Sequence, residues 1–412
     1  MYKIAEQRLS RLIDNGIGNG LAAALTGLEK EALRVMPDGT LSQSKHPRVL
    51  GAPLTHPYIT TDYSEALTEI ITPPCDTIPA ALEFLRHTQQ FMYENLGDEF
   101  LWATSMPCVV AGETSIPIAD YGSSNAGLMK TVYRRGLGHR YGRVMQVISG
   151  VHFNYSFPQA FWPLFQAVEK NNQPVQDFIS DSYFGLIRNL QRFGWLVPYL
   201  FGASPAVCKS FLGGQETSLE TFDAGTYYHP YATSLRMGDI GYQNNKEAKI
   251  GVKASYDSLD AYIHSLAQAI QTPCAEYEAL GVIVNGRHEQ LNANILQIEN
   301  EYYSTIRPKQ LIGAFEKPVH ALKKRGVLYV ELRSLDVNAF DALGVDDRQL
   351  RFIEAFLVFC LLYDSPVISP TERDHIDYNE LITAHRGRDP ELRLRRDDKE
   401  VGLRDWAGEI VT

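Results

Sequence analysis

The sequence has 412 residues, of which 44% are hydrophobic and 21% charged, and its formal net charge is −10. This is an ordinary globular composition, long enough for a large core and a second lobe, and the negative charge argues against nonspecific nucleic-acid binding. The first eight residues lack the apolar core of a signal peptide, and the longest apolar run, 355–363, is too short for a membrane helix, so no membrane partner is expected.

The first half contains a helix over 4–13, a strand over 28–35, a capping turn at 62–65 with a strand around Glu69, a helix over 78–96, a basic helix over 127–141 and a strand over 144–156. The second half contains two helical pieces over 161–197, a turn at 199–205, a tyrosine-rich loop over 226–242, a helix over 256–270, a loop at 306–309, a strand over 327–336, a helix over 347–363 and a charged, less periodic segment from 371 that ends in the first turns of a helix at 403–412. Strands and helices do not alternate as βαβ units, so we expect an α+β fold with a largely antiparallel sheet.

The five cysteines show no C-x-x-C spacing. They are Cys75, Cys108, Cys208, Cys274 and Cys360. Scattered single cysteines favour buried thiols in a reducing compartment over a disulfide framework or a zinc site, so a cytoplasmic protein is expected.

The strand predicted at 327–336 places a carboxylate beside a guanidinium. Because strand side chains alternate with a period of two, Glu331 and Arg333 share one face, whereas Val330 and Leu332 face the other way. The pair is either a simple ion pair or a metal ligand beside a phosphate clamp. Taken alone, the strand favours the ion pair.

Other predicted strands carry acids or an imidazole at the same alternating spacing. They are Glu29 with Glu31, Glu69, and His152 with Asn154. If these strands share a sheet, the carboxylates converge, and neighbouring carboxylates disfavour joint ionisation unless cations are present. Mg²⁺ prefers oxygen ligands and substrate phosphates, so nucleotide chemistry is plausible although the chain has neither G-x-x-x-x-G-K-[ST] nor G-x-G-x-x-G.

Each of these signals also has a structural explanation. Acids on a strand are commonly solvated, and a single histidine such as His152 is commonly hydrogen-bonded in a core or at its rim. The basic helix over 127–141 resembles a solvated face, and the tyrosines between 227 and 242 resemble packing residues. The residues alone therefore indicate an α+β enzyme-like domain that uses metal and phosphate.

Seven ordered stretches resemble the bacterial glutamate–cysteine ligase family of the proteobacterial single-activity type. They are Gly27–Arg34, Ile59–Ala66, Ser149–Asn154, Pro198–Pro205, Tyr231–Arg236, Leu296–Glu301 and Glu331–Asp336. The resemblance implies a glutamine-synthetase-like fold, in which a curved, mainly antiparallel sheet forms a funnel with helices outside. It also implies that ATP phosphorylates the γ-carboxylate of glutamate and that the amine of cysteine attacks the acyl phosphate, giving γ-glutamylcysteine, ADP and phosphate in the first step of glutathione biosynthesis.

The resemblance also implies a role for each site residue. The metal-bearing wall is Glu29, Glu31, Asp62, Glu69, His152 and Glu331, which would bind Mg²⁺ or Mn²⁺. Arg333 would act on the transferring phosphoryl group beside Glu331, and Arg236 would hold the glutamate α-carboxylate. The remaining implied contacts are Gln146 and Asn154 to glutamate or its neighbours, Tyr63, Tyr133, Leu137, Tyr242 and Tyr303 in the cysteine pocket, and Arg307 and Lys309 on the nucleotide side.

The resemblance covers nearly the whole chain. It implies one catalytic domain over 1–412, and we expect a monomer. The charged segment from about 371 to 412 would be the start of a helical region that continues further in other members of the family. Tyr63 stands where the family more often has Phe. A ligase of the same fold with another amine acceptor, or a catalytically silent regulatory homologue, remains an alternative.

Overall fold

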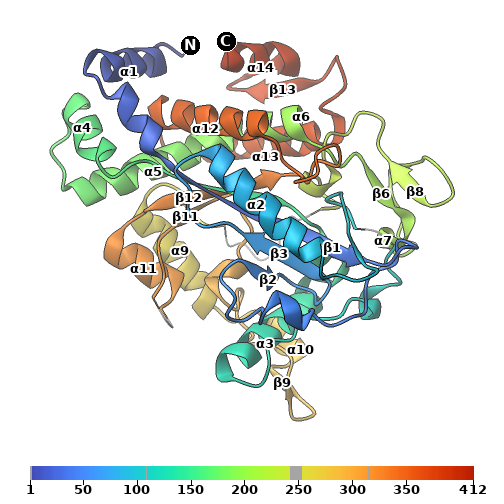
Figure 1. Ribbon diagram of the computed structural model, residues 1–412. Helices are drawn as coiled ribbons and strands as arrows, with labels where there is room; N and C mark the ends of the chain where they lie inside the picture. Colours follow the sequence, from blue (N-terminus) through green and yellow to red (C-terminus); the bar gives the residue numbers. More distant parts are fainter. Residues whose placement is uncertain (1, 108, 242–252, 314–315) are drawn as a thin grey trace.

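A computed structural model describes residues 2–107, 109–241, 253–313 and 316–412. At its centre is a seven-stranded sheet with the strand order β11-β12-β5-β1-β3-β2, and β4 pairs with β1 beside that path. Every pairing in this sheet is antiparallel, which confirms the predicted α+β class. Helices lie outside the sheet (Figure 1).

The strands have the following bounds. The central sheet contains β1 Leu25–Val35, β2 Ile59–Thr61, β3 Leu67–Ile71, β4 Phe100–Leu101, β5 Val151–Ser156, β11 Ile306–Lys309 and β12 Tyr329–Leu335. Three small sheets contain β6 Ala206–Cys208 with β7 Glu220–Thr221 and β8 Thr226–Tyr228, β9 Ile283–Val284 with β10 Arg287–His288, and β13 Arg393–Arg396 with β14 Lys399–Gly402.

Five of the described helices begin at a polar side chain that caps the first turn. Their bounds are α1 Lys3–Asp14, α2 Ile78–Tyr93, α3 Asn125–Tyr141, α4 Phe161–Val168, α5 Val175–Phe193, α6 Leu196–Phe201, α7 Lys209–Leu212, α9 Leu259–Gln271, α10 Ala275–Leu280, α11 Pro318–Arg325, α12 Asp347–Leu362, α13 Pro370–Arg386 and α14 Leu403–Val411. Side-chain oxygens of Thr77, Ser124, Ser258, Asp346 and Ser369 accept first-turn N–H groups. Among the described helices, none has the length and apolarity to cross a bilayer.

Four predictions of the type or number of elements were wrong. Residues 144–147 form the short 3-10 helix η4, so the strand expected over 144–156 begins only at Val151. This apolar run is buried without alternation, and such a run does not distinguish a strand from a helix. The loop expected at 306–309 is β11, which tolerates Pro308 because an edge strand can lack one N–H donor.

The other two errors concern helices. The segment 161–197 forms three helices rather than two, because α5 ends at Gly194 and α6 continues into the predicted turn. The charged segment after 371 contains α13, whose charged side chains obscured its periodicity.

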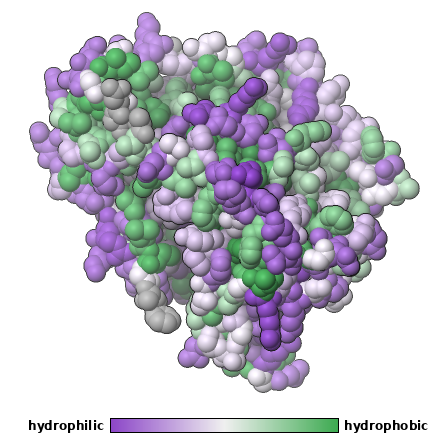
Figure 2. Space-filling model, in the orientation of Figure 1, coloured by the Kyte–Doolittle hydropathy of each residue, from purple (hydrophilic) through white to green (hydrophobic). Residues whose placement is uncertain are grey.

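The two faces of the central sheet have different environments. On one face Leu28, Phe153, Val330 and Leu332 are buried in the main apolar core, which α5 and α12 share (Figure 1). The opposite face of β1 carries Glu29 and Glu31, and further along the strand it carries Leu33 and Val35, which join a second apolar cluster. The acids therefore lie between two apolar regions. On the face of the molecule that Figure 2 shows, hydrophilic and hydrophobic side chains are interspersed, as on most proteins.

A bulge interrupts β12 beside the acids. The register runs Glu331↔Asn154 and Leu332↔Phe153, and the next pair is Leu335↔Val151. From Leu332 to Leu335 β12 advances three residues, whereas β5 advances two from Phe153 to Val151, so β12 holds one extra residue. This extra residue shifts the side-chain alternation by one position after Arg333.

Candidate active site

The predicted acids form a row across adjacent strands. Glu69 on β3 lies opposite Glu31 on β1, and Glu29 lies opposite His152 on β5. Asn154 on β5 in turn lies opposite Glu331 on β12. Because directly opposed residues share a face, three strand pairings place all these side chains on one surface.

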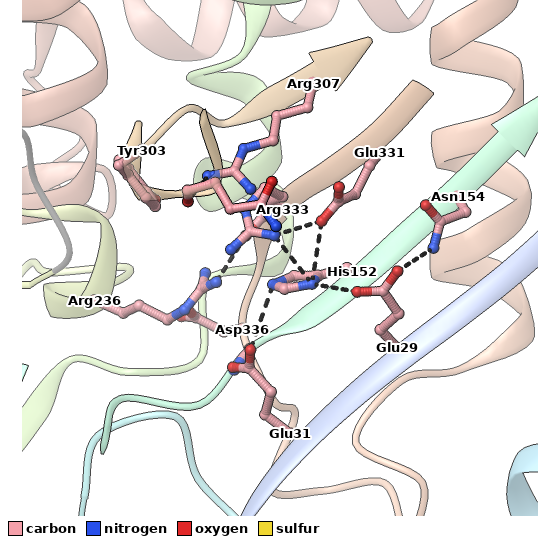
Figure 3. Close-up of polar contacts among 12 residues, drawn as sticks. Glu29, Glu31, His152, Asn154, Arg236, Tyr303, Arg307, Glu331, Arg333 and Asp336 are labelled. Carbon is pink, nitrogen blue, oxygen red and sulfur yellow. Dashed lines mark hydrogen bonds and ion pairs between the residues drawn. The ribbon is translucent and has the colours of Figure 1, made fainter. Parts of the chain in front are cut away.

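His152 lies at the centre of this row (Figure 3). Its Nδ1 atom is 3.1 Å from Glu29 Oε2 and 3.5 Å from Glu331 Oε1, and its Nε2 atom is 3.7 Å from Glu31 Oε1. Asn154 Nδ2 donates to Glu29 Oε1 at 2.9 Å. Within the described ranges, one group of three potential metal ligands is this close together, with ligand atoms of Glu29, His152 and Glu331 all within 4.8 Å of one another.

Two cations lie beside Glu331 on the same face. Lys309 Nζ is 2.6 Å from Glu331 Oε2. Arg333 donates to Glu331 Oε1, and its Nη1 atom is 3.4 Å from His152 Nδ1. The ion pair that the sequence suggested is therefore present, within a larger cluster of acids and bases.

The acids differ in the direction in which the fold shifts their pKa values. Burial raises the pKa of Glu69 well above its ordinary value, and the charge of Glu29 raises it further. Burial also raises the pKa of Glu31. Burial alone would raise the pKa of Glu331 too, but the charges of Lys309 and Arg333 outweigh it and hold that pKa well below the ordinary value. The row therefore has excess negative charge near Glu69 and compensated charge near Glu331.

Asp62 belongs to the negative end of the row. It follows β2, and its charge helps to raise the pKa of both Glu31 and Glu69. Its main-chain carbonyl accepts hydrogen bonds from Arg134 of α3 and, at 3.1 Å, from the Tyr121 hydroxyl. All six predicted wall residues thus lie in one region.

Arg236 is also buried beside this face, with 4% of its surface exposed. It lies in the 3-10 helix η5, Leu235–Met237, inside the predicted loop 226–242. Its Nη2 atom donates to the main-chain carbonyl of Arg333 at 2.7 Å, and its Nη1 atom is 3.7 Å from Asp336 Oδ1. The structure therefore brings together the two arginines that the sequence analysis singled out.

The remaining predicted contacts are less closely grouped. Gln146 is buried in η4. Arg307 lies opposite Glu331 and donates to the carbonyls of Asn300 and Tyr302, so it holds the turn before β11. Lys309, by contrast, contacts the acid row directly.

The predicted aromatic pocket is partly described. Tyr63 and Leu137 are buried in the second apolar cluster, against which Tyr133 packs. Tyr303 lies near both arginines, whose charges oppose the rise in its pKa that burial causes (Figure 3). Tyr242 lies outside the described residues.

Sequence reasoning missed several supporting residues. Asp336 was quoted within a motif but given no role, and Ser204 and Ser234, which donate to it, were also not singled out. The basic helix α3 was interpreted as a solvated face, which was wrong for Arg140, since its buried guanidinium lies 2.9 Å from Glu301. A buried arginine among acids in distant segments has no local sequence signal.

The sequence is similar to known glutamate–cysteine ligases. A family model described as glutamate-cysteine ligase matches residues 9–382. The glutamate–cysteine ligase of Alcanivorax borkumensis is 50% identical over 416 residues, which cover 100% of this chain and 79% of that protein. The glutamate–cysteine ligase of Shewanella amazonensis is 49% identical over 406 residues, which cover 98% of this chain and 77% of that protein.

Solved structures give the same relationship. The glutamate–cysteine ligase of Francisella tularensis, in complex with AMP, matches with a TM-score of 0.88 and 42% identity, covering 94% of this chain and 76% of that one. A bifunctional glutathione synthetase from Pasteurella multocida has the same fold, with a TM-score of 0.74 and 24% identity, covering 97% of this chain and 46% of that one.

Proposed function

The chain belongs to the glutamate–cysteine ligase family, and we propose that the acid row on the central sheet is its active site. The enzyme uses ATP to join the γ-carboxylate of glutamate to the amine of cysteine, the first step of glutathione synthesis. The observation that carries the site assignment is the convergence of Glu29, His152 and Glu331 from three adjacent strands, beside Arg333 and Arg236.

The donor set fits a hard divalent cation. Five carboxylates and one imidazole share the face, and burial together with mutual repulsion already raises the pKa of Glu69. Mg²⁺, or Mn²⁺ in its place, would relieve that repulsion, and we assign its binding to Glu29, Glu31, Asp62, Glu69, His152 and Glu331. When bound, the metal supplies charge neutralisation for the phosphates of ATP.

Arg333 has the geometry of a phosphoryl clamp. A carboxylate nucleophile and a triphosphate repel each other, so positive charge fixed at the reacting phosphorus favours the transition state. Burial lowers the pKa of Arg333, but the charges of Glu331 and Glu31 raise it above the ordinary value, so the guanidinium stays charged. Its planar donors match the equatorial oxygens of a transferring phosphoryl group.

We assign substrate recognition to residues around this clamp. Arg236 binds the glutamate α-carboxylate, and Asn154 and Gln146 supply polar contacts. An oxygen of the γ-carboxylate then bonds to the terminal phosphorus of ATP as the bond to ADP breaks. The cysteine amine attacks the resulting acyl carbon, phosphate leaves, and the amine loses a proton.

The acyl phosphate must be protected from water until the amine arrives. Tyr63, Tyr133, Leu137 and Tyr303 supply apolar and aromatic surface suited to that task and to a thiol side chain, and we assign Tyr242 to the same pocket from its sequence alone. A pocket of this kind discriminates one methylene by only about 10–200-fold. We therefore expect measurable use of 2-aminobutyrate.

Compartment and assembly belong to the same proposal. Cys75, Cys208, Cys274 and Cys360 are free thiols, which suits the reducing cytoplasm. All six wall residues come from one chain, so a monomer suffices for catalysis.

The decisive experiment measures ADP release with glutamate, ATP and Mg²⁺, with and without cysteine. Cysteine-dependent ADP release with formation of γ-glutamylcysteine is expected. ADP release with other amines but not with cysteine would show that the enzyme uses a different amine acceptor. Absence of ADP under both conditions would identify a silent homologue.

A further inference from the structure

Asp336 is a buried carboxylate with an unusually complete set of donors. It is 1% exposed and directly follows β12. Its Oδ2 atom accepts from the main-chain N–H of Ala203 at 2.9 Å and from Ser204 Oγ at 2.6 Å. Its Oδ1 atom accepts from Ser234 Oγ at 3.0 Å and lies 3.7 Å from Arg236 Nη1. A carboxylate fixed in this way presents its charge in one direction, towards Arg236.

The bulge in β12 is what brings Asp336 to this position. Regular alternation from Leu332, which lies in the main core, would turn Asp336 to the same apolar side. The extra residue between Leu332 and Leu335 shifts the alternation, so Leu335 enters the core and Asp336 reaches Arg236. Bulges of this kind commonly reorient a side chain next to an active site.

Arg236 is fixed from three sides. Asp336 faces Nη1, which also donates to Met237 Sδ at 3.3 Å, the carbonyl of Arg333 accepts from Nη2, and Gly150 leaves the space that Nη2 needs. A Cβ atom added at Gly150 would lie 2.2 Å from Nη2. Figure 3 shows Arg236 directed towards Arg333 and Asp336. Because a guanidinium has five N–H donors, these contacts leave others for a ligand.

We propose that Asp336, held by Ser204 and Ser234, is a positioning residue that orients Arg236 for the α-carboxylate of glutamate. The proposal rests on the proposed role of Arg236. Asp336 balances the buried charge of Arg236 before substrate binds and restricts the side chain to one orientation, so less ordering remains to be done on binding. Through the carbonyl of Arg333, the same contacts tie glutamate recognition to the strand that carries the phosphoryl clamp.

Asp336→Asn tests this role with little change in shape. The amide can still hydrogen-bond to both serines, since hydroxyl groups donate and accept, but it loses the charge that faces Arg236. We expect the KM for glutamate to rise at least about tenfold, as for a lost charged contact. The KM for ATP and cysteine should change by less than about threefold, and saturating glutamate should restore most of the turnover.

Matched variants distinguish a specific effect on the orientation of Arg236 from a general disturbance of the folded protein. Asp346→Asn changes the N-cap of α12, away from the site, and should leave all three KM values unchanged. Arg236→Ala should itself raise the KM for glutamate, and Asp336→Asn in that background should add less than about twofold, because the two residues act as one unit. Should Asp336→Asn fail to fold, Ser234→Ala, which removes a donor to the same Oδ1 atom, should raise the KM for glutamate selectively.

Three results would be decisive against the idea. An unchanged glutamate KM in Asp336→Asn, or equal increases in all three KM values, would overturn positioning by Asp336. Fully additive effects of Asp336→Asn and Arg236→Ala would do so as well. If Arg236→Ala leaves the glutamate KM unchanged, it is the proposed role of Arg236 that fails, and this outcome is distinct from those three.

Discussion

Arg333 and Glu331 form an ion pair on one face of β12, and the Arg333 guanidinium also lies 3.4 Å from the His152 ring. The pair alone would be a structural contact. Its neighbours change that interpretation, because His152 and Glu331 belong to a three-residue group of potential metal ligands. The position of the guanidinium at the edge of this group supports the proposal that it acts on a bound phosphate.

Arg333→Ala should therefore reduce turnover by at least about a hundredfold, the usual consequence of removing a contact that strengthens in the transition state. The measurement is steady-state ADP release at saturating substrates. Arg351→Ala is the control, since Arg351 is an exposed arginine paired with Asp347 on α12. Turnover close to that of the unmodified enzyme would mean that Arg333 has only a structural role, as the partner of Glu331.

Glu69 should make the metal-free protein lose stability as pH rises. Its folded-state pKa lies above the ordinary value of 4.5 because of burial and neighbouring acids. The folded protein then holds the proton more tightly than the unfolded chain, so stability is greatest below about pH 4.5 and falls as pH rises through the folded pKa.

Glu69→Gln should remove this loss. We expect the free energy of unfolding of the metal-free variant to exceed that of the unmodified protein at pH 8 and to approach it at pH 4.5. The variant should also need more Mg²⁺ for half-maximal activity. Parallel pH profiles for the two proteins would contradict the assignment of Glu69 to the repelling acids.

Lys309→Met tests the nucleotide side. The Lys309 ammonium lies 2.6 Å from Glu331 at the edge strand β11, where it can also attract a phosphate. We expect the KM for ATP to rise about tenfold, as for one lost charged contact, with glutamate little affected. Lys323→Met on the exposed side of α11 is the control. An unchanged ATP KM with an altered Mg²⁺ requirement would instead make Lys309 a partner of the metal wall.

Gly150→Ala should weaken glutamate binding selectively. The new Cβ atom would lie 2.2 Å from Arg236 Nη2, so the guanidinium must move. A displacement of about 1 Å in a positioned group can cost about a hundredfold in activity, and we expect a tenfold or greater rise in the glutamate KM. Gly408→Ala on α14 meets no atom within 4 Å and serves as the control. Glutamate binding by calorimetry provides an independent readout.

Lys30→Met should stabilise the protein. Lys30 is 5% exposed on the helix-covered face of β1, and burial lowers its pKa from 10.5 to about 8. Below pH 8 the folded state must carry a buried charge at a cost of up to about 3 kcal/mol, which disappears as pH rises from 8 towards 10.5.

The variant avoids that cost but loses the hydrogen bond from Lys30 to Gln89. We expect a net gain of about 1–2 kcal/mol at pH 7, shrinking by pH 10, measured by denaturant unfolding. Lys324→Met at an exposed position is the comparison. A destabilised Lys30→Met protein would mean that the hydrogen bond outweighs the buried charge.

Strand alternation predicted correctly which side chains share a face of the sheet. The spacing of Glu29 with Glu31, and of Glu331 with Arg333, was enough to place each pair on one face. It could not say which strands are neighbours, because pairing between β1, β5 and β12 joins segments more than a hundred residues apart. The ordered family resemblance supplied what local periodicity could not.

Other features had no local signal. Lys30 alternates with two acids and so occupies the apolar face, where a lysine is not expected. The support of Arg236 by Asp336 depends on one extra residue in β12. Pro308 suggested a loop, and only the edge position of β11 explains why a strand forms there.

The bulge in β12 ties the length of this segment to the way it pairs with β5. A chain of the same length without the bulge would turn Asp336 towards the apolar core, whereas deletion of Ser334 would restore regular pairing and keep Leu335 in the core and Asp336 on the side of Arg236. Related enzymes in which this spacing is one residue shorter should therefore pair the two strands without a bulge and keep the acid on the same side.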